Sequence, residues 1–175
     1  IAFIGTIIPN ATFYASVVHL PAGVMSILIS TVPLIAFPMA LALGIDRFSG
    51  MRVLGLGLGI AGVALIAGPS GDVNLWWLAA AMVGPLFYAT EATYVARQGT
   101  AGMDAVQAMF GVSLVGAVIA APLALGTGQW VDPMPFGRAE AAMVILAAVH
   151  ALVYAAYVWL AGRAGSVFAS QSTYI

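Results

Sequence analysis

The side chains of this chain that could bind a solute or carry a proton lie at helical spacing inside long apolar segments. Side chains three or four residues apart share one face of a helix, so such residues form polar stripes. Stripes of this kind occur in five segments, and a cavity between those segments would have polar walls. The residues that we predict to line this cavity are Asn10, Tyr14, Ser30, Tyr88, Glu91, His150, Tyr154 and Ser170.

His150 lies near the middle of its apolar segment, roughly ten residues or ~15 Å from either end of a helix. An imidazole at the middle of a membrane could bind substrate or accept a proton near neutral pH. The alternative is a neutral histidine that shares its N–H with a tyrosine or serine of a neighbouring helix. Both interpretations place His150 inside a bundle.

Glu91 lies ~9 Å inside Arg97 along the same helix. A carboxylate at that depth costs ~2 kcal/mol unless it faces water or a partner. It could recognise a cationic substrate or carry a proton, and it could instead extend toward the inner interface. The amide of Asn10 and the phenols of Tyr14 and Tyr88 could contact a ligand, although bonding or packing between helices is the commoner use of such groups.

Composition places these segments in a lipid bilayer. Hydrophobic residues make up 63% of the 175 residues and charged residues only 6%, against roughly a quarter charged in soluble domains. The net charge of -1 is scattered without a basic face, so nucleic acid is not an expected partner. The absence of Cys excludes disulfides, thiolate zinc sites and iron–sulfur clusters, and we expect no cofactor or metal.

The chain is predicted to be an all-α, polytopic transmembrane helical bundle. A bilayer core of ~30 Å needs ~20 mostly apolar residues in one helix, and long apolar runs here alternate with breaks rich in Pro, Gly and charge. We predict helices at 2–20, 23–44, 51–68, 75–96, 104–125 and 140–161, and a seventh that begins at 165. The third and fifth of these carry few polar residues, so we expect them to face lipid or support the others.

Arginine is distributed unequally between the two sets of alternate loops. Arg47, Arg52, Arg97 and Arg163 fall at the second, fourth and sixth breaks, whereas the other breaks contain only Arg138. Because cytoplasmic loops retain positive charge, we predict that the first set is cytoplasmic.

Two parts of the chain resemble each other. Residues 13–16 (FYAS) before Leu20 resemble residues 153–156 (VYAA) before Leu160. Equivalent elements are five helices apart, an odd number, so the two copies would insert in opposite orientations. Inverted repeats of this kind are typical of secondary transporters, whose substrate site lies near the membrane midplane between the repeats.

A set of motifs makes the chain similar to a known family. The motifs are Tyr14-Ala15, 20–23 (LPAG), Ser26, Pro33-Leu34, Asp46-Arg47 and 54–65 (LGLGLGIAGVAL). Through them the chain resembles EamA-type members of the drug/metabolite transporter (DMT) superfamily, closely from 13 to 68 and more loosely from 75 to 175. The family usually shows Leu-Gly-Glu-Arg where this chain has 44–47 (GIDR), a departure that bears on the role of the acid rather than on the fold.

The resemblance implies a ten-helix plan of two inverted five-helix repeats. Residues 1–68 would be the last three helices of the first repeat, and residues 75–175 the first four helices of the second, the last of them truncated. The chain would thus be a fragment with about seven helices, three to nine of that plan.

The predicted function is a secondary-active transporter of small organic metabolites such as amino acids or drugs, more specifically an exporter. It would act by alternating access at a midplane cavity in the plasma membrane, as a multi-pass protein of a bacterial inner membrane, with a proton as a candidate coupling ion. The alternative is a non-transporting membrane scaffold or assembly protein. An intramembrane enzyme is disfavoured, because Glu91 and His150 differ in depth and the chain has neither a Cys nor a Ser-centred turn motif.

Overall fold

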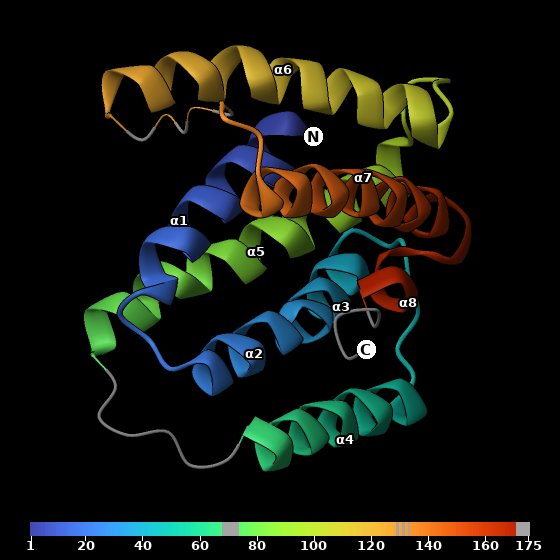
Figure 1. The fold of residues 1–175 in the computed structure, drawn as a ribbon. Coiled ribbons are helices and arrows are strands. Elements are labelled where there is room, and N and C mark those ends of the chain that lie inside the picture. The colour runs from blue at the N-terminus through green and yellow to red at the C-terminus, as the bar shows by residue number, and fades with distance from the viewer. Residues whose placement is uncertain (68–73, 129, 131, 133, 171–175) are drawn as a thin grey trace.

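Every regular element that the structure describes is a helix (Figure 1). The structure is a computed structural model, and it describes residues 1–67, 74–128, 130, 132 and 134–170. The elements are η1 (Ala2–Ile7), α1 (Ile8–Val17), α2 (Ala22–Ser30), α3 (Val32–Ala42), α4 (Gly50–Ala67), α5 (Leu75–Gln98), α6 (Ala105–Gly126), α7 (Arg138–Ala164) and α8 (Ser166–Ser170). The prediction of an all-α chain is confirmed.

Two of the predicted helices are interrupted near proline residues. The predicted helix 2–20 consists of the π-helical turn η1 followed by α1, whose second residue is Pro9. Proline lacks an N–H, so the carbonyl of Gly5 loses its usual α-helical donor and the backbone winds differently there. The predicted helix 23–44 is divided at Thr31, two residues before Pro33, and the Thr31 hydroxyl donates to the Leu28 carbonyl at 2.6 Å.

The remaining helix ends lie close to their predicted positions because local side chains cap them. Asp104 precedes α6, where its carboxylate accepts from the Gln107 N–H at 2.8 Å and its own N–H donates to Gln107 Oε1 at 3.1 Å. Such a capping box satisfies N–H groups that the first helical turn leaves free. Helix α7 begins at Arg138, before the predicted residue 140, and the Gly137 N–H donates to Glu140 Oε2 at 2.8 Å.

Helix α5 is the central element of the bundle. It contacts η1, α1, α2, α3, α7 and α8, and its side chains Ala81, Ala89 and Ala92 are fully buried. These small residues let neighbouring backbones approach closely, as is usual between membrane helices. Helices α4 and α6 lie at opposite edges of the bundle (Figure 1), where most of their large apolar side chains are exposed.

Within the described residues, three helical segments are long and apolar enough to cross a membrane. They are Ala22–Ala42, which joins α2 and α3, Ala105–Gly126 and Arg138–Ala164. Ala2–Val17 and Gly50–Gly62 are apolar but shorter. These spans and the composition are those of a membrane protein, which accords with the predicted multi-pass location.

Successive long helices run in alternating directions along the bundle (Figure 1). The ends of α3, α5 and α7 and the starts of α4, α6 and α8 therefore lie at one end of the molecule. Arg47 follows α3, Arg97 is in the last turn of α5 and Arg163 is in the last turn of α7. The loops that the arginine distribution groups together thus share one end of the fold.

This arrangement predicts which loops are accessible from the same side of a membrane. The chain has no Cys, so each single variant carries one label site. Phe48→Cys and Met103→Cys should react with a membrane-impermeant maleimide from the cytoplasmic side. Val18→Cys and Thr127→Cys should react from the opposite side. The reason is that the two pairs of residues are exposed at opposite ends of the bundle. Labelling of right-side-out and inside-out vesicles measures this, and opposite sidedness of Phe48→Cys and Met103→Cys would contradict the fold.

Candidate functional site: a buried carboxyl beside an open cavity

The Glu91 carboxyl lies in the interior of the bundle, where its side chain is 0% exposed. It occupies the second half of α5, and the Tyr154 hydroxyl of α7 donates a hydrogen bond to its Oε1. A buried carboxyl without partners is strongly unfavourable in apolar surroundings, so this bond fixes how α7 is placed on α5. The Glu91 side chain is therefore directed into the bundle and does not extend toward the membrane interface.

The two carboxyl oxygens of Glu91 differ in their hydrogen bonding. Oε2 has no hydrogen-bond partner among the described residues. The carboxyl lies directly against Gly5 of η1, where an added Cβ would be 2.0 Å from Glu91 Cδ and Oε1 and 2.2 Å from Oε2. Only a residue without a side chain leaves room for the carboxyl at this point.

A second polar contact, one helical turn before Glu91, connects α5 with α1. The Tyr88 hydroxyl donates to Asn10 Oδ1 at 3.0 Å. Tyr88 and Glu91 are three residues apart and so share one face of α5. From this face one bond goes to α1 and one to α7, which brings polar groups of three helices together.

Aromatic rings continue this cluster along α7. The His150 and Tyr154 rings stack with centroids 5.9 Å apart, and the Tyr154 and Tyr157 rings are tilted at 6.0 Å. Tyr154 is buried, whereas His150 is exposed on the surface of the described bundle. The ring of Tyr154 thus lies between the buried Glu91 carboxyl and the exposed imidazole of His150.

His150 opens onto a cavity of about 730 Å³ between η1, α1, α6 and α7. Asn10 and Tyr14 of α1 line the same cavity, and the Tyr14 side chain is 67% exposed. Thr6 also lines it and lies beside the Tyr154 hydroxyl. Neither Glu91 nor Tyr154 is among the described residues that line the cavity, and Thr6 connects its wall with the Glu91 cluster.

The two predicted serine positions lie away from this cavity. The Ser30 hydroxyl is buried in α2 and donates to the Ser26 carbonyl at 2.7 Å. The Ser170 hydroxyl is buried in α8 and donates to the Val167 carbonyl at 3.0 Å. Each hydroxyl thus has a hydrogen bond within its own helix.

The structure adds residues to the site that the stripes did not single out. Gly5 carries no polar group, and no pattern along the chain shows what its missing side chain accommodates. Helix α6 also lines the cavity, through Ser113, Gly116, Ala117 and Ala120 among others, although it was expected to face lipid or support other helices. The spacing of its small residues was the available signal, because residues three and four apart share a face.

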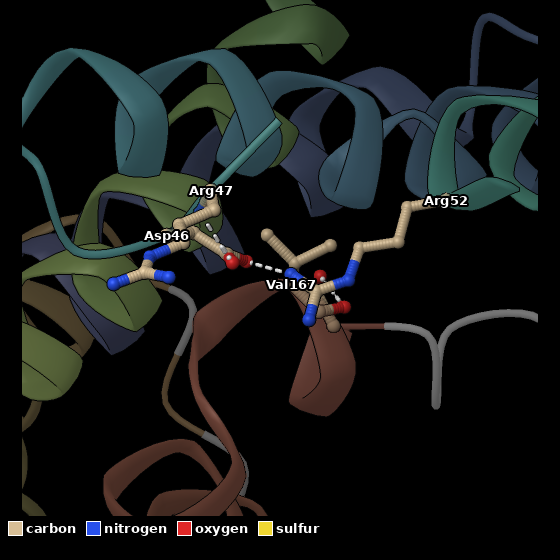
Figure 2. Close-up of polar contacts among 5 residues, drawn as sticks. Asp46, Arg47, Arg52 and Val167 are labelled. Carbon is tan, nitrogen blue, oxygen red and sulfur yellow. Dashed lines mark hydrogen bonds and ion pairs between the residues drawn. The ribbon is translucent and has the colours of Figure 1, made fainter. Parts of the chain in front are cut away.

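The acid at position 46 has a local role in the loop between α3 and α4. Asp46 pairs with Arg52 at the start of α4 and accepts from the Arg47 N–H at 2.7 Å. Figure 2 shows this group beside Val167 of α8. Because these side chains are partly exposed, the pair contributes little stability, on the order of 0–1 kcal/mol, and its effect is to order the connection.

Comparison with known proteins gave no further grounds for a family assignment. No protein-family model, curated protein or solved structure matched this chain. The resemblance to EamA-type transporters therefore stays a prediction. Function must be inferred from the cavity and from the Glu91 cluster beside it.

The contact between Gly5 and Glu91 predicts a strong effect of one added methyl group. Gly5→Ala should lower folded yield and destabilise the protein by ~1–3 kcal/mol, because the carboxyl would have to move. Gly84→Ala is the matched control, since its Cβ would meet only the Pro9 carbonyl, at 3.7 Å. Thermal unfolding in detergent, followed by circular dichroism, measures both.

A double variant identifies the carboxyl as the cause. Glu91→Ala removes the clashing atoms, so Gly5→Ala should cost much less in that background than in the wild type. An undiminished cost would show that Gly5 is needed for another reason.

The bond between Tyr154 and Glu91 yields a further prediction. Tyr154→Phe should destabilise the protein by ~1–3 kcal/mol, because it leaves both carboxyl oxygens buried without a donor. Tyr157→Phe is the control, since among the described residues none accepts a hydrogen bond from the Tyr157 hydroxyl. Equal melting temperatures for the two variants would contradict this assignment.

Proposed function

We propose that this chain is part of a secondary-active membrane transporter that exports small organic metabolites. The observation that carries the proposal is the Glu91 carboxyl, fully buried and held by Tyr154 beside an open cavity lined by Asn10, Tyr14 and His150. An ionisable group inside apolar helices is costly, and in membrane proteins such groups are typical of substrate and ion pathways. A cavity of about 730 Å³ has ample room for a small organic solute.

The proposal includes membership of the EamA-type transporters and their plan of two inverted repeats, with residues 1–68 in the first and 75–175 in the second. The two helices that carry the resembling segments, α1 and α7, both contact α5 and run in opposite directions (Figure 1). Opposite directions are what an inverted repeat requires. In this plan the protein resides in a bacterial inner membrane and alternates access by movement of one repeat against the other.

Glu91 is the proposed site of proton coupling. Its Oε2 has no partner among the described residues, and a proton needs almost no volume, which suits a carboxyl packed against Gly5. Protonation would remove the charge that makes burial costly. The proposal therefore needs no cofactor and no enzymatic step, only a solute and an ion gradient.

The scaffold alternative explains less of this geometry. In a protein that only assembles with others, the buried carboxyl would serve helix packing alone, and the open cavity would have no role. The polar groups here also come from three helices and meet next to a cavity, instead of being scattered on the surface. We therefore retain the scaffold as the outcome to be expected if no solute is transported.

The two histidines of the chain provide a matched test. The experiment is uptake of radiolabelled amino acids, organic cations, organic anions and uncharged metabolites into proteoliposomes that hold the protein containing this chain, with and without a pH gradient. His150→Ala should reduce uptake at least ~10-fold, because it removes the imidazole from the cavity wall. His19→Ala should leave uptake unchanged, since His19 stacks on Trp77 at 3.9 Å, away from the cavity.

Each result bears on a different part of the proposal. Uptake that is equal in both variants would remove His150 from the site while leaving a transporter. No saturable uptake of any solute by the wild-type protein would reject transport and favour the scaffold.

A further inference from the structure

A second cavity lies along α6, nearer the end of the bundle where the arginine-containing loops meet. It has a volume of about 540 Å³ and is lined by η1, the end of α5, the connection to α6 and the first half of α6. The larger cavity, which contains His150, follows α6 from Met109 to Leu123. Helix α6 thus forms one wall of both spaces.

Val112 is the single residue common to the described linings of the two cavities. Its side chain is only 7% exposed, whereas Val115 and Val118 on the same helix are 43% and 67% exposed. Helix α6 contacts η1, which also lines both cavities. The linings of the two cavities overlap along α6 between residues 109 and 115, and the isopropyl group of Val112 forms part of the wall of both.

The two cavities together extend along most of a membrane thickness. They follow α6 from Ala108 to Leu123, which at 1.5 Å per residue is ~22 Å of a bilayer core of ~30 Å. The smaller one reaches the loop at residues 99–103, and the larger one reaches toward the opposite end of α6. Val112 is the residue that both described linings share.

The chemistry of the walls is uniform along this path. No Asp, Glu, Lys or Arg is among the described side chains that line either cavity. The polar groups are amides, hydroxyls and one imidazole, among them Gln98, Thr100, Asn10, Ser113 and His150. Walls of this kind can hydrogen-bond a neutral molecule but supply no side-chain carboxylate, ammonium or guanidinium group to compensate the desolvation of a full charge.

The geometry points to a translocation route along α6 for uncharged, largely apolar organic solutes, closed between its two cavities by Val112. This inference rests on the proposed transport function and narrows its substrate class. In this proposal the solute passes between α6, a peripheral helix of the described bundle, and the rest of the bundle. In this proposal, displacement of the Val112 side chain joins the two cavities.

The route is tested by blocking it after the protein has folded. Because the chain has no Cys, Val112→Cys can be reconstituted into proteoliposomes and alkylated there with a small permeant benzyl maleimide. Uptake of a solute identified in the uptake panel should fall at least ~10-fold on alkylation. Val118→Cys is the matched control, since Val118 lies on α6 but lines neither cavity, and its alkylation should leave uptake unchanged.

The outcomes separate this route from transport itself. Mass spectrometry establishes that each variant is fully alkylated. Uptake that continues in fully alkylated Val112→Cys protein rejects the route along α6 while transport stands. Resistance of Val112→Cys to alkylation in the folded protein also rejects it, because a residue on the route must be reached by a small organic reagent. Absence of uptake in unmodified wild-type protein rejects transport and the route together.

The substrate class is tested by competition between three solutes with one ring system. Indole-3-acetamide is uncharged, tryptamine is cationic and indole-3-acetate is anionic at neutral pH. The amide should inhibit uptake of the identified solute at concentrations at least ~10-fold lower than either ion. Equal or stronger inhibition by either ion would reject the uncharged class. Inhibition by tryptamine would in addition indicate the Glu91 carboxylate as its counter-charge.

Discussion

The packing of this chain depends on burying one carboxyl group inside an apolar bundle. Glu91 has no exposed surface, so its cost must be offset by what lies against it. Tyr154 supplies a donor from α7, and Gly5 supplies space on η1. The positions of two neighbouring elements are therefore set by a single side chain of α5.

The same requirement explains why α5 is the central helix. Its small residues allow η1, α1, α3 and α7 to approach closely, and its polar face at Tyr88 and Glu91 gives two of these neighbours a specific partner. Apolar packing alone is weakly directional in a bilayer, because lipid is as apolar as the side chains. The polar contacts fix which helices meet and in what rotation.

The peripheral helices have fewer constraints, and this bears on function. Helix α4 contacts α2, and helix α6 contacts η1 and α7. Helix α6 covers two cavities instead of completing a filled core. A helix with few neighbours can move at low cost, whereas Asn10 on the opposite wall of the larger cavity is bonded to Tyr88 of the central helix. The larger cavity thus has one wall, at α1, that is bonded to the central helix, and another, at α6, that has fewer neighbours.

Most of the helices could be predicted from the chain alone, because apolar length, proline, glycine and capping residues act locally, although the divisions before Ile8 and at Thr31 were not predicted. The sequence also determined which polar residues share a face, as Tyr88 with Glu91 and His150 with Tyr154 show. The sequence could not determine which faces meet. Helical spacing fixes the angular position of each side chain around the axis of its own helix, but it does not fix the rotation of the neighbouring helix. That Tyr154 donates to Glu91, that Gly5 lies against the same carboxyl, and that α6 lines the cavity follow only from the folded arrangement, because each depends on contacts between residues far apart in the chain.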